Sequence, residues 1–340
     1  MRCVSLVALL VGACSNGTAT VDEGCASSLP GASLLNGSPD VLARVNCYRG
    51  YLGLPHMSVS SGVQAAAEAH AHWLEVNDVL GPAPKVDVRD WNGVVREVEG
   101  TDGYTGLSPY DRNAKTGVTV AGGLPTNIWG IFRFHADVDP DRWIMEPSVR
   151  DALFQPKVLG VGEATVTLGG VERAYTDVFA AIPSGTRLLR PVVYPKDGQE
   201  DVPAAWTDLA QVWDDKLTNH KWIGFPVTIT MGSDQQGHVS INPFQIAVVS
   251  ATLTNPDGKE VPIRVIPPTG TFAGFLRTTI VLAPNAPLAV DTEYAVDAEI
   301  TSLFGTTMVH TTFRTSPTPT DTDSPDTDLP DTDAPDTDAP

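Results

Sequence analysis

Apolar residues at helical spacing predict three helices in the first half of the chain. The longest, over Val59–Asn77, has one apolar face built from positions three or four residues apart: Val63, Ala66, Ala67, His70 and Leu74. An earlier helix starts at Ser38-Pro39-Asp40, where an N-cap precedes a proline at the first helical position, and it extends to Gly53. The third helix is expected over Ile144–Phe154.

Alternating apolar and polar residues predict strands. Val158–Val166 and Glu172–Ala181 read as a strand pair around the turn Gly169-Gly170. After Pro183, short alternating runs recur at Val227–Met231, His238–Asn242, Ile246–Thr254, Val261–Ile266, Arg277–Leu282, Glu293–Ile300 and Thr307–Arg314. Asn255-Pro256-Asp257-Gly258 separates two of them, as a hairpin turn would. This series of short strands predicts an immunoglobulin-like β-sandwich over 190–315.

The N-terminus has the pattern of an export signal. Arg2 precedes an apolar run that is too short to span a bilayer, and the run closes on Val-Gly-Ala-Cys. That ending resembles the lipobox of bacterial lipoproteins, which would make 1–13 a signal peptide and Cys14 the lipid-bearing N-terminus. The alternative is a soluble export signal with an incidental cysteine. The Ser15 that follows favours an outer-membrane lipoprotein, facing the periplasm or the cell surface.

Composition limits the partners. The 42% apolar content of 340 residues suits two domains, and the net charge of −19 argues against nucleic acid as a partner. Residues 14–37 read as a tether, and 317–340, with its Pro-Asp-Thr-Asp repeats, reads as a disordered acidic tail. Cys25 and Cys47 remain after processing and are expected to form a disulfide in an oxidising compartment; a metal site from two such distant cysteines is the alternative.

Several segments in order resemble the bacterial branch of the CAP superfamily (SCP/PR-1-like proteins). They are Asn46-x-x-Arg49 with Gly53-Leu54-Pro55, the helix with His70, Gly103-Tyr104-Thr105-Gly106 through Arg112, Asn127-Ile128, Pro147-Ser148-Val149-Arg150, and Gly160-Val161-Gly162. The resemblance covers 38–183 and implies an α-β-α sandwich. The fold class is therefore α+β: a CAP-like sandwich, then an all-β Ig-like sandwich. Tyr194-Pro195-Lys196-Asp197-Gly198 resembles the segment that opens such a second domain in this family.

The resemblance also implies a cleft with two histidines and two glutamates that hold a divalent metal. Val149 and Thr126 stand at two of those positions, and neither residue titrates near neutral pH. The remaining candidates for polar cleft residues are Glu97, Glu99, His135 and Glu146, each of which we expect at a solvated loop position. His70, on an apolar helix face, is expected to be a buried, hydrogen-bonded structural histidine.

These observations favour an envelope-anchored, non-catalytic binding or interaction module without cofactor or metal. Its partner would be a small ligand or another envelope or extracellular protein, with the membrane reached through the lipid anchor. The alternatives are a CAP-type hydrolase or metal-binding protein that uses Glu97 or Glu99 with His135, and an envelope spacer without ligand. On this view, replacing Glu97, Glu99 or His135 changes stability little.

Overall fold

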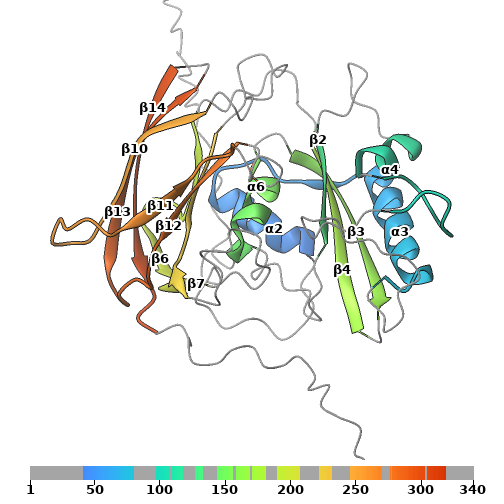
Figure 1. Ribbon diagram of the computed structural model, residues 1–340, viewed down its shortest axis with the longest axis horizontal. Coiled ribbons are helices and arrows are strands. Elements are labelled where there is room, and N and C mark those ends of the chain that lie inside the picture. The colour runs from blue at the N-terminus through green and yellow to red at the C-terminus, as the bar shows by residue number, and fades with distance from the viewer. Residues whose placement is uncertain are drawn as a thin grey trace, which may run out of the picture.

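The computed structural model describes residues 41–79, 97–107, 109–117, 127–132, 144–155, 158–168, 171–180, 190–206, 222–231, 246–269, 276, 278–302 and 305–318. Within these residues the chain is a mixed α+β protein (Figure 1). Its helices are α2 (Val41–Tyr51), α3 (Ser61–Val76), α4 (Pro109–Lys115) and α6 (Pro147–Leu153). None of the helices in this described part is long and apolar enough to cross a bilayer.

The first half contains a four-stranded sheet in the order β1-β3-β4-β2. Its strands are β1 (Ser58–Val59), β3 (Val158–Leu168), β4 (Val171–Ala180) and β2 (Asn127–Phe132). Helix α3 packs against β3 and β4, and Gly162 in β3 permits its close approach. A Cβ atom at Gly162 would lie 2.3 Å from the carbonyl carbon of Val63 in α3, so no larger residue fits there.

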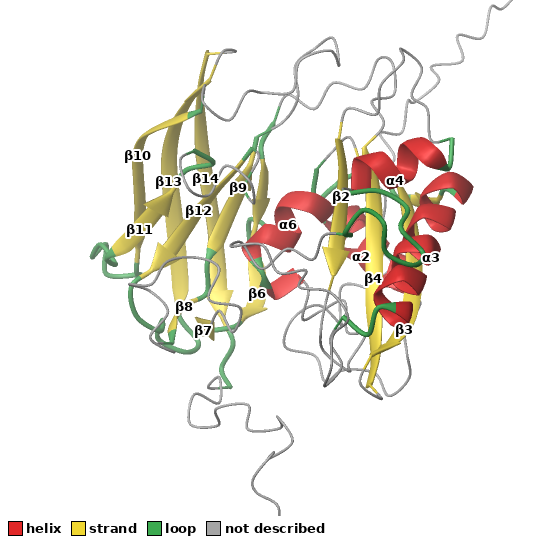
Figure 2. Cartoon of the chain, turned by 45° about the vertical axis from the view of Figure 1, so that its right-hand side comes forward, coloured by secondary structure: helices red, strands yellow, loops and turns green. Residues whose placement is uncertain are grey.

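The second half contains two four-stranded sheets that form a sandwich (Figure 2). One has the order β10-β13-β14-β6, with β10 (Ala247–Thr254), β13 (Glu293–Ser302), β14 (Gly305–Thr315) and β6 (Gln199–Val202). The other has the order β11-β12-β9-β5, with β11 (Ile263–Ile266), β12 (Thr279–Pro284), β9 (Val227–Thr230) and β5 (Val192–Tyr194). The short strands β7 (Ala205–Trp206) and β8 (Ile223–Gly224) pair with each other. Side chains of β13 alternate between buried and more exposed, as expected for a strand with one face in the core.

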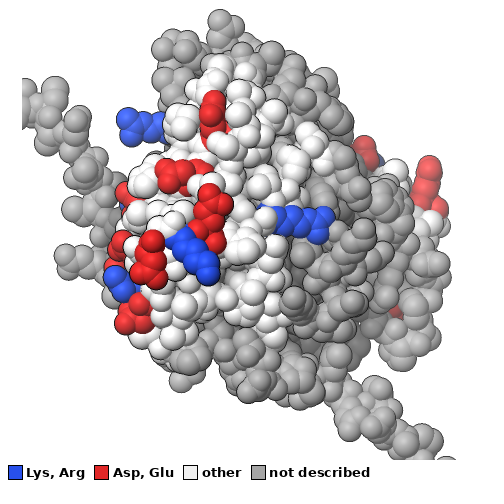
Figure 3. All heavy atoms as spheres, turned by 60° about the vertical axis from the view of Figure 1, so that its left-hand side comes forward, with Lys and Arg blue, Asp and Glu red and all other residues white. Residues whose placement is uncertain are grey.

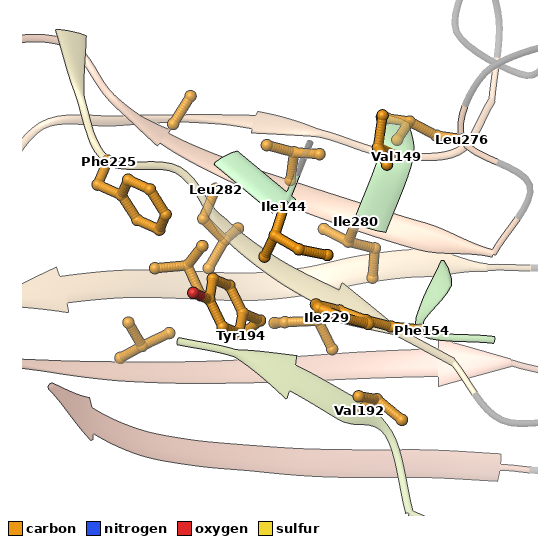
Figure 4. Close-up of a cluster of buried hydrophobic side chains, with 14 of the residues drawn as sticks. Ile144, Val149, Phe154, Val192, Tyr194, Phe225, Ile229, Leu276, Ile280 and Leu282 are labelled. Atoms are coloured by element: carbon orange, nitrogen blue, oxygen red, sulfur yellow. The ribbon is translucent and has the colours of Figure 1, made fainter. Parts of the chain in front are cut away.

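Helices α2 and α6 lie between the first sheet and the sandwich (Figures 1 and 2). Every residue of β9 and β12 is buried, because these strands have protein on both faces. The rings of Tyr48 in α2 and Phe154 after α6 meet Tyr194 of β5, with centroids 6.3 Å and 5.5 Å from it. The helices and the sandwich therefore share one hydrophobic core (Figure 4).

The buried side chain of Arg150 stabilises this core through hydrogen bonds and ring contacts. The guanidinium of Arg150 in α6 donates to the carbonyl oxygens of Ile144 (2.6 Å), Met145 (2.9 Å) and Pro226 (2.6 Å). The same group lies 4.8 Å from the ring centroid of Tyr194 and 4.6 Å from that of Phe225. Pro226 immediately precedes β9, so Arg150 joins the helix to the sandwich across the segment boundary expected from the sequence.

Most of the expected elements are confirmed. The structure has the three helices, the strand pair as β3 and β4, and β9 to β14 at the predicted runs. His238–Asn242, the signal, the tether and the tail from residue 319 lie outside the described residues. The hairpin turn at Asn255 is also present, with an antiparallel bridge between Thr254 and Glu260, although β10 and β11 on either side of it belong to different sheets. Helix α4 and the strands β1, β2 and β5 to β8 were not predicted.

The division into two domains at 183–190 stays a prediction. The described residues on either side of it contribute to the one core of Figure 4, so the two segments pack together. Cys47 lies in α2, whereas Cys25 lies outside the described residues. The Cys25–Cys47 pairing therefore also stays a prediction.

Candidate functional site

The most unusual polar cluster in the described residues lies where the loop 97–107 crosses helix α3. His70 faces inward from α3 and is 1% exposed, and Glu97 at the start of the loop is fully buried at 0%. His70 Nδ1 lies 2.8 Å from Glu97 Oε1. The prediction that His70 is a buried, hydrogen-bonded histidine is confirmed. The expectation that Glu97 occupies a solvated loop position is wrong.

Both oxygens of the Glu97 carboxylate are occupied by protein donors. Oε1 accepts the His70 hydrogen bond and a 2.7 Å bond from the Thr105 hydroxyl. Oε2 accepts the backbone N–H of Thr105 and, at 3.0 Å, the backbone N–H of Gly106. A buried carboxylate is costly unless it is paired and hydrogen-bonded, and this arrangement supplies four bonds to one group.

Glycine is required at position 106 for this loop to close on the carboxylate. Gly106 has a φ of +156°, and a Cβ atom there would lie 2.7 Å from Asp111 Cβ and 2.9 Å from the backbone nitrogen of Arg112. Any side chain would push the loop away from α4 and draw the Gly106 N–H away from Glu97. Thr105 and Gly106 therefore donate their backbone N–H groups to Glu97, and Gly106 also allows the loop to approach α4 closely.

The electrostatics keep this pair in one protonation state. Burial lowers the pKa of His70 from 6.5 to about 4, although the hydrogen bond to Glu97 raises it. Burial alone would raise the pKa of Glu97, but the hydrogen bonds from His70 and Thr105 outweigh it and hold that pKa below its usual range. Arg112 Nε lies 3.9 Å from Glu97 Oε1. At neutral pH, a neutral imidazole therefore donates its Nδ1 proton to an ionised carboxylate beside a guanidinium.

Further contacts beside the His70–Glu97 pair hold the loop 97–107 against helix α3. The indole of Trp73 stacks on His70, with ring centroids 5.7 Å apart and an interplanar angle of 9°. Its Nε1 donates to Thr101 Oγ1 at 2.8 Å, and Asn77 Nδ2 donates to the Asp102 carbonyl at 2.9 Å. His70 and Trp73 of α3 and its C-cap residue Asn77 lie on one side of the helix, which explains why a polar histidine occurs within its apolar stripe.

The other candidate residues do not join this cluster. Glu99 is exposed, and Glu146 is half-buried at the N-cap position of α6 without a side-chain capping bond. His135 and Thr126 lie outside the described residues. Val149, at the position where the CAP resemblance expects a histidine, is 3% exposed and belongs to the apolar core with Leu276 and Ile280 (Figure 4).

No group of three or more metal-ligating side chains occurs among the residues that the structure describes. His72 is exposed on the side of α3 away from His70. Two residues along a helix are about 200° apart, so these histidines cannot share an ion. Chemically, the His70–Glu97 pair can stabilise the loop, but its atoms face one another and the protein interior.

Thr105, Gly106 and Arg112 are the participants that sequence reasoning did not assign. They lie in the Gly103–Arg112 segment that carries part of the family resemblance, and that segment was the available signal. What the sequence did not reveal is that its backbone donors turn toward Glu97.

Comparisons with known proteins add little to this geometry. No protein-family model matches the chain, and no curated protein matches it. Among solved structures, the chain is similar to an outer surface protein from Borrelia burgdorferi, with 14% sequence identity and a TM-score of 0.29. The match covers 42% of this chain and 90% of that chain. A likeness at this level does not place the chain in a family.

Proposed function

We propose that this chain is an envelope-anchored lipoprotein whose folded part is a non-catalytic binding or interaction module. The proposal combines a CAP-like first domain over 38–183, an Ig-like sandwich over 190–315, a disordered acidic tail and a lipid anchor at Cys14. Its place is the outer membrane, facing the periplasm or the cell surface. The resemblance of the sequence motifs and the order of helices and strands along the chain support the domain assignment.

One observation carries the non-catalytic assignment. Glu97 is one of the candidate cleft residues, and its carboxylate is fully buried and accepts four hydrogen bonds from the protein. A general base or a metal ligand needs a free lone pair directed toward substrate or ion. Glu97 would have to break bonds to Thr105 and Gly106 to provide one.

Val149 supports the same conclusion. The CAP resemblance expects a metal-binding histidine there, but the valine side chain fills the core between α6 and the sandwich. A residue in this position contacts apolar side chains and not a solvent-filled cleft. The competing proposal is a hydrolase or metal-binding protein that uses Glu97 or Glu99 with His135, a residue that lies outside the described residues.

The test is a calorimetric titration of the full chain with Zn²⁺ and, separately, with Ca²⁺. We expect only weak heats without a defined stoichiometry, which the Asp-rich tail accounts for. A one-to-one isotherm with micromolar or tighter affinity, weakened in Glu97→Gln but not in the exposed control Glu99→Gln, would contradict the proposal.

A further inference from the structure

We infer that the outer edge of β10 is a docking site for an extended, basic polypeptide segment of a partner protein, which adds to the sandwich as an extra strand. This inference rests on the proposed interaction role and names the surface and the partner class. β10 is the end strand of its sheet, in the order β10-β13-β14-β6. Edge strands carry a row of backbone donors and acceptors that can pair with another chain.

Among the residues that the structure describes, no strand lies beside the outer edge of β10 along most of its length. Val249 is 57% exposed, and Ala247 and Ser250 are exposed as well. Within the described residues, pairing on this side of β10 occurs only at its C-terminal end. There Leu253 O accepts the Val261 N–H at 2.8 Å, and Thr254 forms a bridge to Glu260.

The direction of the free backbone groups follows from that bond. Leu253 O points away from β13 because it binds Val261. Backbone groups two residues apart on a strand point to the same side, so the N–H and C=O of Ala251 also point outward. An incoming strand would continue the ladder from this position toward the N-terminal end of β10.

The strand β10 has only one of the usual protections of an edge, a bulge near its N-terminal end. Ala-Val-Val-Ser-Ala-Thr-Leu-Thr contains no charged residue and no proline. Natural edge strands commonly use lysine, proline or a bulge to prevent pairing. Only a register shift between Val248 and Ser250 is present here, and it leaves the following residues in regular pairing with β13.

Charge favours a basic partner over a second copy of this chain. Ser250 pairs with Glu299 and Thr252 pairs with Asp297 on β13, so small side chains separate the free edge from two carboxylates. An added strand would lie about 10 Å from β13, since neighbouring strands are about 4.8 Å apart. Lysine or arginine side chains at alternate positions of the added strand would extend across Ser250 and Thr252. They would reach toward the carboxylates of Glu299 and Asp297. Figure 3 turns this side of the molecule forward and shows acidic side chains on it, interspersed with lysine and arginine side chains.

A second copy offers no such match. It would bring another uncharged edge and another acidic face, in a chain whose net charge is −19. Like charge on both partners opposes association, whereas opposite charge increases both affinity and association rate. The surface therefore fits an extended segment with basic residues on one face.

The experiment measures binding of a fluorescent eight-residue peptide, in which Lys alternates with Val or Thr, to the full chain by anisotropy. Ala251→Pro removes one outward N–H, and Ala251→Ser is the matched control that keeps it. We expect Ala251→Pro to weaken binding about fivefold or more, in line with the loss of one to two backbone hydrogen bonds, and Ala251→Ser to bind like the wild type. The same peptide N-methylated at alternate residues should bind the wild type equally weakly, which keeps the test valid even if Ala251→Pro fails to fold.

Equal binding of the normal and N-methylated peptides would overturn the inference, since charge on the acidic tail alone would then explain the interaction. A concentration-dependent dimer that Ala251→Pro dissociates would also overturn it, by assigning the edge to a second copy. Neither outcome affects the zinc and calcium titration, which tests the proposed function separately.

Discussion

Replacing Glu97 should destabilise the protein far more than any change at a solvated acid. In Glu97→Ala, the backbone N–H groups of Thr105 and Gly106 and the His70 Nδ1 proton lose their acceptor in a buried site. A buried donor left without a partner costs about 1–3 kcal/mol, and breaking a buried ion pair costs about 3–5 kcal/mol. Removal of the carboxylate also relieves its own desolvation, so we expect a net loss of about 3–5 kcal/mol.

Glu97→Gln should cost less, about 1–3 kcal/mol. Its amide oxygen can accept the Thr105 and Gly106 N–H groups, but these bonds lose the strengthening that a charged acceptor provides. This revises the sequence-based expectation that Glu97 contributes little to stability. Glu99→Gln, at an exposed position of the same loop, is the control and should change stability by less than about 0.5 kcal/mol.

The assay is urea unfolding followed by far-UV circular dichroism and tryptophan fluorescence. Trp73 stacks on His70, so the fluorescence includes a signal from this cluster alongside that of the other six tryptophans. A loss of about 3–5 kcal/mol is a large part of the roughly 5–15 kcal/mol that stabilises a typical protein. Glu97→Ala within about 0.5 kcal/mol of the wild type would refute the burial and bonding assigned to Glu97.

Four further predictions concern His70, Arg150, the cysteine pair and Cys14. Burial lowers the pKa of His70 to about 4, so between pH 6.5 and 4 the unfolded chain binds a proton there that the folded chain does not. The contribution of His70 to the free energy of unfolding should therefore be complete above pH 6.5 and fall by about 3 kcal/mol in total as the pH drops from 6.5 to 4. In urea unfolding, His70→Gln should remove this part of the pH dependence, and the exposed control His72→Gln should not. Arg150→Met should lower the free energy of unfolding by about 2–4 kcal/mol, because three carbonyl oxygens lose their donor. An unchanged urea midpoint would contradict the role of Arg150 in joining α6 to the sandwich. Thiol labelling of the mature, oxidised protein should find neither Cys25 nor Cys47 reactive, and two labelled thiols would exclude the proposed disulfide. Cys14→Ala should leave the washed membrane fraction, whereas the matched control Cys3→Ala should stay in it; equal membrane recovery of both variants would contradict lipid anchoring.

The repetitive part of the fold could be predicted from the sequence. Helix α3 follows from its stripe of apolar residues, and β9 to β14 follow from alternation and turn residues. Helix α4 could not be predicted in this way, because Pro-Tyr-Asp-Arg-Asn-Ala-Lys has no apolar stripe of its own. It is held by packing against α3 and β2, which only the tertiary structure supplies.

The candidate site was predictable only in part. An apolar helix face around His70 was enough to expect a buried histidine, but its partner Glu97 is 27 positions away in a turn-rich segment. Burial of Glu97 depends on backbone donors at Thr105 and Gly106, and sequence pattern does not report the direction of backbone N–H groups. Likewise, the hydrogen-bond acceptors of the Arg150 side chain are the carbonyl oxygens of Ile144, Met145 and Pro226, and sequence pattern does not report where backbone carbonyl groups point.

The most direct test of the central claim, that the His70–Glu97 pair is a closed structural contact, is ¹⁵N NMR of the histidine-labelled full chain from pH 4.5 to 8. His70→Gln assigns the His70 signals. We predict a neutral imidazole with its proton on Nδ1 and no titration midpoint between pH 5 and 8. A His70 midpoint between pH 6 and 7 would show a solvent-accessible proton-exchanging pair and would contradict the non-catalytic account.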